Sequence, residues 1–144
     1  MRITSTMKTT PMRSRAIVLI LATMITTWAG AAAAGDVYVI CSDGVALKAD
    51  EVRNVFLGEK GFAGSVKLLP ADNSAAQADF LEKVLKLDPS KYTVIWTKKS
   101  FRDGTNPPPV KGNDAEAIAY VKQTPGACTY VSSAPAGVTV VAKF

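Results

Sequence analysis

Stretches of β-branched residues alternate along the chain with stretches in which apolar residues recur every three or four positions. Residues 37–41 (VYVIC) are continuously apolar, which is typical of a strand covered on both faces. Residues 74–87 instead place their apolar side chains at helical spacing. The full pattern predicts strands at 37–41, 65–69, 127–131 and 138–142, and helices at 49–57, 74–87, 88–101 and 113–123. This order predicts an α/β domain whose sheet is at least partly parallel.

Capping and helix-breaking residues define several ends of these elements. Asp88 followed by Pro89 has the pattern of an N-cap and a first helical residue. Asn113 and Glu116 have the spacing of a capping box at the start of the fourth helix. Pro70 is expected to end the second strand, and three consecutive prolines at 107–109 are expected to stiffen the loop over residues 102–112.

The first 34 residues have the three-part pattern of a secretory signal peptide. A basic stretch over residues 1–15 precedes ten apolar residues at 16–25, and small residues follow that end in Ala-x-Ala at Ala34. Ten apolar residues are about half of the roughly 20 that a membrane span needs, although an uncleaved anchor is the alternative interpretation. Cleavage at or near Ala34 predicts a periplasmic or secreted domain over residues 35–144, without a membrane span.

The net charge of +5 comes mainly from this N-terminal segment. Four of the 17 basic residues and none of the 12 acidic ones lie in residues 1–34, so residues 35–144 carry 13 basic and 12 acidic residues. A nearly neutral domain lacks the broad basic surface that nucleic-acid binding requires. We therefore expect no nucleic-acid partner.

The residue types present also restrict the chemistry. The chain has no histidine, which excludes imidazole bases, histidine-based catalytic triads and histidine metal ligands. Two cysteines cannot form a four-cysteine zinc or iron–sulfur site. No pair of carboxylates stands out as an acid–base pair. We therefore expect a protein that is not an enzyme and has neither a metal centre nor a cofactor.

The two cysteines lie in two different predicted strands, at Cys41 and Cys128. In an oxidising compartment such a pair can form a disulfide, which would close a loop of 87 residues. The alternative is two buried thiols that act as small apolar side chains. The sequence leaves both possibilities open, because it does not show whether the two strands are neighbours.

The third predicted helix combines aromatic and basic residues. Trp96 and Phe101 are expected to be core residues rather than a platform for sugar stacking. Lys98, Lys99 and Arg102 form a small basic cluster beside the proline loop. Such a cluster can attract an anion or an acidic partner, and the alternative is a solvated helix end whose cations suit the helix dipole.

Four ordered segments resemble the phosphate ABC-transporter substrate-binding family, in particular its compact PBP-like domain. The resemblance covers about residues 36–132 and implies one lobe of a type II periplasmic-binding-protein-like fold, a mixed sheet flanked by about four helices. Typical members have two lobes that close on the ligand, and this chain has residues for one. The segments are residues 47–58 (LKADEVRNVFLG), residues 66–85, Trp96 with Phe101 and Gly104, and residues 114–131 (DAEAIAYVKQTPGACTYV).

The resemblance also implies where a ligand would bind. Phosphate binders of the family carry Ser-Gly-Thr at the start of the helix after the second strand, with an arginine four positions before the serine. Here the serine is Ser74, whereas alanines replace the glycine and threonine and Pro70 replaces the arginine. The alternative interpretation is that these residues only cap a helix or, at Ser42, form a turn. The candidate ligand-binding residues are Asp72, Asn73, Ser74, Ala75 and Ala76. Ser42 is added for a separate reason, since it follows the first strand and ligands of open α/β sheets collect beyond the carboxyl ends of strands.

Two functions follow from these patterns. The first is an exported, non-enzymatic solute-binding-like protein with a degraded anion site, whose partner would be a small oxyanion bound weakly or not at all. The second is a periplasmic protein–protein interaction module that has lost ligand binding, with an unidentified periplasmic protein as its partner. An enzyme is the least supported class.

Overall fold

The computed structural model describes residues 35–144, so the predicted signal peptide lies outside the described residues. The helices are η1 (Ala49–Glu51), α1 (Val52–Phe56), α2 (Gln77–Phe80), the π-helical turn η2 (Leu81–Leu85), α3 (Pro89–Asp103) and α4 (Asp114–Gln123). The strands are β1 (Tyr38–Cys41), β2 (Phe62–Ala63), β3 (Val66–Lys67), β4 (Leu69–Pro70), β5 (Asp72–Asn73), β6 (Val110–Lys111), β7 (Ala127–Val131) and β8 (Thr139–Lys143). None of the helices within residues 35–144 has the length and hydropathy of a membrane span.

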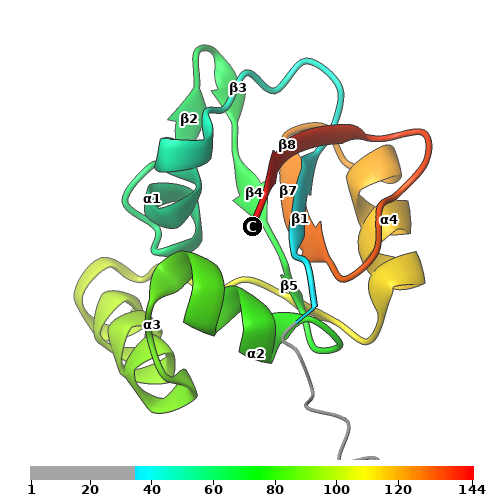
Figure 1. The fold of residues 1–144 in the computed structure, drawn as a ribbon. Helices are drawn as coiled ribbons and strands as arrows, with labels where there is room; N and C mark the ends of the chain where they lie inside the picture. Colours follow the sequence, from blue (N-terminus) through cyan, green and yellow to red (C-terminus); the bar gives the residue numbers. More distant parts are fainter. Residues whose placement is uncertain (1–34) are drawn as a thin grey trace, which may run out of the picture. The chain divides into compact units, whose positions relative to one another are not determined.

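A four-stranded mixed sheet with the order β4-β7-β1-β8 forms the centre of the domain (Figure 1). Strand β1 is antiparallel to both β7 and β8, whereas β4 is parallel to β7. Two smaller ladders accompany the sheet, the β2–β3 hairpin and the parallel pair β5–β6. The domain is therefore α/β with a mixed, partly parallel sheet, as the sequence predicts.

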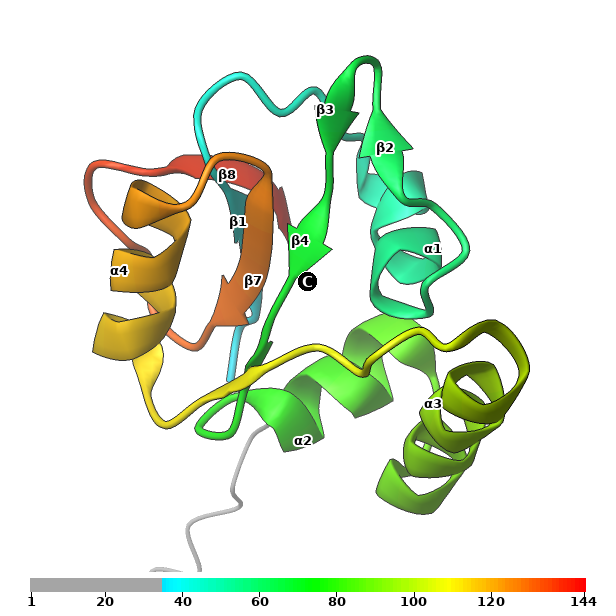
Figure 2. The same cartoon turned by 180° about the vertical axis from the view of Figure 1, so that it is seen from behind.

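Helices cover both faces of the sheet, which explains why β7 is buried along its whole length (Figures 1 and 2). Helix α4 packs on one face through Ala117 and Val121 against Ile40 and Val131. Helices α1, α2 and α3 lie on the other side of the sheet, around a larger core. There the ring of Tyr130 stacks on Phe80 at a centroid distance of 3.8 Å. The apolar faces predicted for the helices at 49–57 and 113–123 are thus the buried ones.

The two cysteines form a disulfide between the central strands. Cys41 and Cys128 are directly opposite each other in the antiparallel β1–β7 pair, with their Cα atoms 4.1 Å apart. Both are fully buried. The structure therefore resolves the alternative that the sequence left open, in favour of the disulfide.

Pro70 does not end a strand, contrary to the sequence-based expectation. Residues 65–69 divide into β3 and β4, and Pro70 is the second residue of β4. The amide of Leu69 donates to the carbonyl oxygen of Gly126, just before β7, and the amide of Ala71 donates to that of Cys128 in β7. The nitrogen of Pro70 therefore faces away from β7, where its missing N–H breaks no hydrogen bond of the sheet.

Two helical predictions also require correction. The helix expected at 74–87 begins at Gln77 and continues as a π-helical turn, because residues 72–76 belong to a strand and a turn. Phe101, expected in the core, is 89 % exposed, since the last turn of α3 extends beyond the packed layers. Trp96, one and a half turns earlier, is buried as predicted.

Candidate functional site

Asn73 organises the turn in which most of the candidate ligand-binding residues lie. Its side-chain amide donates to Asp114 Oδ1 at 2.7 Å and to the carbonyl oxygen of Tyr130 at 3.0 Å. Its Oδ1 accepts the amide N–H of Ala75 at 3.1 Å. Asn73 is fully buried, so one side chain fixes the turn to both α4 and β7.

The polar donors of the turn over residues 72–76 already have partners within the protein. The amides of Asp72 and Ser74 donate to carbonyl oxygens of the neighbouring segment, at Pro109 and Lys111, and the amides of Ala75 and Ala76 donate to Asn73. The Ser74 hydroxyl is likewise directed at the carbonyl oxygens of Lys111 and Gly112. An anion at this turn would have to displace these acceptors before it could bind.

The cation nearest to the turn in the β5–β6 ladder also has another contact. Lys111 pairs with Asn73 in that ladder, but its ammonium group lies 4.5 Å from the centroid of the Tyr120 ring. The turn therefore combines occupied donors with a lysine whose charge is directed elsewhere.

Asp72 points inward from the turn, into a pair of tyrosines. The Tyr92 hydroxyl lies 3.1 and 3.0 Å from the two carboxylate oxygens, and the Tyr130 hydroxyl donates to Oδ1 at 3.0 Å. Asp72 is only 3 % exposed. Burial raises the pKa of Asp72 to about 6, against the opposing effect of the two tyrosine hydrogen bonds. Burial, together with the Asp72 charge, also raises the pKa of both tyrosines.

A cavity of about 270 Å³, which we call the α3 cavity, lies between α3 and the loop that follows it. Asp72 and Tyr92 line it, and so does Trp96, whose buried Nε1 makes no hydrogen bond of normal geometry within the described residues and interacts only with the nearby Tyr92 hydroxyl. Thr93, Thr97, Ser100, Gln77, Pro107, Pro108 and Val110 complete the lining.

Ser42 lies at the other end of β7 from this turn. Its hydroxyl oxygen accepts the amide N–H of Gly126 at 2.7 Å, just before β7 begins. It lines a separate cavity of about 240 Å³ together with Asp43, Lys122 and Gly137. The structure thus brings Asp72 to Ala76 together in one turn and leaves Ser42 apart from them.

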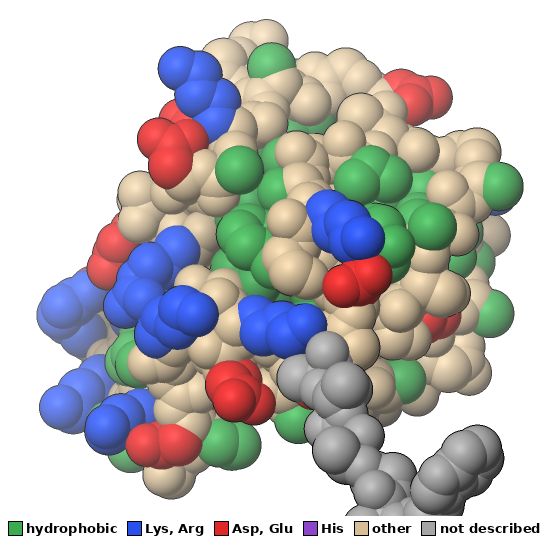
Figure 3. Space-filling model, viewed as in Figure 1, with side chains coloured by type: hydrophobic (Ala, Val, Ile, Leu, Met, Phe, Trp, Pro, Cys, Tyr) green, Lys and Arg blue, Asp and Glu red, His purple; other side chains and the backbone are tan. Residues whose placement is uncertain are grey.

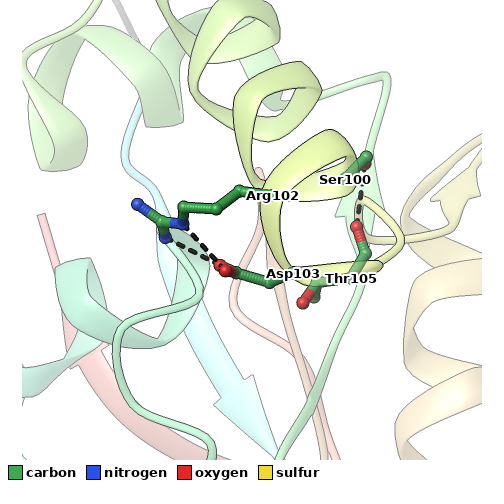
Figure 4. Close-up of polar contacts among 4 residues, drawn as sticks. All are labelled: Ser100, Arg102, Asp103 and Thr105. Carbon is green, nitrogen blue, oxygen red and sulfur yellow. Dashed lines mark hydrogen bonds and ion pairs between the residues drawn. The ribbon is translucent and has the colours of Figure 1, made fainter.

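In the basic cluster at the end of α3, Lys98 and Arg102 are exposed and Lys99 is half-buried, and Lys and Arg side chains gather over this helix (Figure 3). Arg102 forms two hydrogen bonds with the neighbouring Asp103, at 2.8 and 2.7 Å (Figure 4). Ser100 closes the helix end by donating to the carbonyl oxygen of Thr105 at 2.8 Å. This is the geometry of a solvated helix end, with one of its charges paired within the helix.

Sequence reasoning missed three polar groups of this site, the hydroxyls of Tyr92 and Tyr130 and the N–H of Trp96. It assigned these residues only to a helix face or a strand. The available signal was Asp72, an acidic residue between two short apolar segments, which requires polar partners if it is buried. No group of three or more metal-ligating side chains lies within residues 35–144. Neither a protein-family model nor a curated protein sequence matches the chain.

Proposed function

We propose that the protein is an exported, non-enzymatic solute-binding-like protein, built on a single lobe of a type II periplasmic-binding-protein-like fold whose oxyanion site has degenerated. The mixed sheet with helices on both faces supports the fold part of this proposal. The observation that carries the functional part is the turn over residues 72–76, in which four backbone amides donate to protein acceptors. Its mechanism is reversible association without bond chemistry.

Phosphate should bind weakly or not at all. A desolvated dianion needs cations and free donors around it, and each missing charge-assisted hydrogen bond weakens binding by roughly 1.5–3 kcal/mol. Here Pro70 provides neither charge nor N–H, and the Asp72 carboxylate adds a like charge. We expect no dissociation constant below the millimolar range.

Isothermal titration of phosphate and sulfate into the purified protein at low salt tests this expectation. The variant Ser74→Ala serves as a control, because it removes the one family side chain that the turn retains. Neither protein should release measurable heat. A low-micromolar phosphate affinity that Ser74→Ala weakens would show that the site is functional and that this proposal is wrong.

Export is the second part of the proposal, supported by the three-part pattern of residues 1–34. The processed protein should begin at Gly35 or within a few residues of it. N-terminal sequencing of the protein from the extracytoplasmic fraction provides the measurement. An intact Met1 in the membrane fraction would contradict it.

An interaction module is the second candidate function, and one surface favours it. A groove of about 450 Å³ runs between α1, the β2–β3 hairpin and the proline loop, and Phe62 at its side is 58 % exposed. If this groove holds a protein partner, Phe62→Ser should abolish crosslinking to that partner in cells. Val94→Ser, at an exposed position on α3, is the matched control that should leave the crosslink intact.

A further inference from the structure

The Asp72 carboxylate is buried without a cation beside it. Its hydrogen-bond partners are the neutral hydroxyls of Tyr92 and Tyr130. Burial and these two hydroxyls are the influences on its pKa, and no lysine or arginine is among them. Buried carboxylates in folded proteins are normally paired with a positive charge, because an unpaired charge is costly to desolvate. The charge of Asp72 therefore lacks a counter-ion among the described residues.

A second polar group with an unmet requirement lines the same cavity. Trp96 is 5 % exposed, and its Nε1–H makes no hydrogen bond of normal geometry within residues 35–144, although the Tyr92 hydroxyl lies near enough to interact with it. An indole N–H can only donate, so an oxygen of a bound ligand in a better position than Tyr92 would complete its hydrogen bonding. One cavity is therefore lined by a carboxylate without a cation and by a tryptophan whose N–H lacks a well-formed hydrogen bond.

The remaining polar groups of the α3 cavity complete an environment that favours a cation. The hydroxyls of Thr93, Thr97 and Ser100 each donate to a backbone carbonyl oxygen, which leaves their oxygens free to accept. No lysine or arginine lines the cavity. The aromatic rings of Tyr92 and Trp96 can also stabilise a cation near their faces.

We propose that the α3 cavity binds a small primary ammonium compound that carries a neighbouring hydroxyl or carbonyl oxygen, with the Asp72 carboxylate as its counter-ion and the Trp96 N–H as donor to that oxygen. This inference rests on the proposed function, since it names the class of solute that the single lobe binds. A primary ammonium fits better than a quaternary one, because the cavity offers several acceptors for its three N–H groups. The volume of about 270 Å³ corresponds to about nine water molecules at about 30 Å³ each, which is ample for a small amine.

Titration with three small probes of similar size tests the charge preference. Ethanolamine carries an ammonium and a hydroxyl, ethylene glycol is its neutral analogue, and glycolate is an anionic analogue. We expect the purified protein to bind ethanolamine at least tenfold more tightly than either analogue, as measured by chemical-shift titration. Equal or tighter binding of ethylene glycol or glycolate would overturn the cation preference but leave solute binding intact. No binding of any probe would overturn the inference, whereas the proposed function would still be judged by a thermal-shift screen of other solutes.

Variants assign the binding to the two groups. Asp72→Asn retains the shape of the side chain and one acceptor oxygen but removes the charge, and it should weaken ethanolamine binding at least tenfold. Trp96→Phe retains an aromatic ring without the N–H and should weaken ethanolamine more than it weakens propylamine, which lacks the oxygen. Asp103→Asn removes an exposed carboxylate on the same helix and should change neither affinity. Equal ethanolamine affinity in Asp72→Asn and Asp103→Asn, with both variants folded, would refute the assignment to Asp72.

Discussion

The hydroxyl of Tyr130 donates a 3.0 Å hydrogen bond to the Asp72 carboxylate and thereby links the end of β7 to the candidate turn. Tyr130 is fully buried and its ring stacks on Phe80, so its position is fixed by the core. Asp72 in turn is held by a second hydroxyl, from Tyr92 on α3. The one charge of the turn is therefore directed into the protein rather than toward an approaching anion.

Replacing Asp72 with Asn should remove a pH dependence of stability. The pKa of Asp72 is about 6 in the folded protein, against an ordinary value of 3.8, so the folded state binds more protons than the unfolded state between these values. The free energy of unfolding should therefore fall as pH rises through this window, by up to about 3 kcal/mol from this group. Asp72→Asn should lose this fall, as measured by urea unfolding at pH 4.5 and 7.

The comparison between variants isolates Asp72 from other carboxylates. Hydrogen bonds to lysines lower the pKa of Asp36 and Glu51. The stability that these two carboxylates contribute to the fold is therefore lost only at more acidic pH. The exposed variant Asp50→Asn should retain the wild-type profile. Identical profiles for Asp72→Asn and the wild type would contradict the prediction.

Replacing Asn73 with Ala should destabilise the fold by about 2–4 kcal/mol. The change leaves the carbonyl oxygen of Tyr130 and the amide of Ala75 without their side-chain partner, in a fully buried position. Denaturant unfolding followed by circular dichroism measures the loss. Asn106→Ala, in the exposed proline loop, should change stability by less than about 0.5 kcal/mol. A loss of similar size in both variants would argue against a structural role for Asn73.

Gly126 should be far more sensitive to substitution than Gly104, although both have positive φ angles. A Cβ atom at Gly126 would lie 2.0 Å from the carbonyl oxygen of Lys67, whereas at Gly104 it would meet nothing within 4 Å. Gly104→Ala should cost about 1 kcal/mol from backbone strain alone, and Gly126→Ala about 3 kcal/mol or more because a strand must also move. Thermal unfolding of both variants makes the comparison, and equal melting temperatures would contradict it.

The disulfide between Cys41 and Cys128 should contribute about 4 kcal/mol, because it restricts a long loop of the unfolded chain. The urea midpoint of the wild type should fall when reductant is present during unfolding. A double variant, Cys41→Ala with Cys128→Ala, should have a lowered midpoint that reductant does not change. If the wild type kept the same urea midpoint after both cysteines had been reduced and fully alkylated, the contribution of the disulfide would be refuted.

Local patterns were sufficient for most of the fold. The N-caps at Asp88 and Asn113 form as predicted, because each side chain accepts the backbone N–H three residues later. The strand order was not predictable, since the pairing of β1 with both β7 and β8 depends on contacts between residues about a hundred positions apart. The exposure of Phe101 was missed for a similar reason: where α3 leaves the core is set by the packing of other elements.

The candidate turn was located by sequence but its hydrogen bonds were not. Hydroxyl and amide residues such as Asn73 and Ser74 have the same pattern whether they cap a helix, bind a ligand or hold another segment of the chain. The third case applies, because β6 and the end of β7 supply the acceptors from 37 to 57 positions away. The partners of Asp72 lie 20 and 58 positions away in the sequence, and no local pattern encodes such separations.

Pro70 also influences how the sheet meets other molecules. Strand β4 forms one edge of the sheet, and there the proline nitrogen faces outward without a hydrogen to donate. A strand from another molecule that approached this edge would find an incomplete ladder, so edge-to-edge stacking into fibrils is disfavoured on this side. Pro70 therefore gives the β4 edge resistance to self-assembly, even where the protein becomes concentrated.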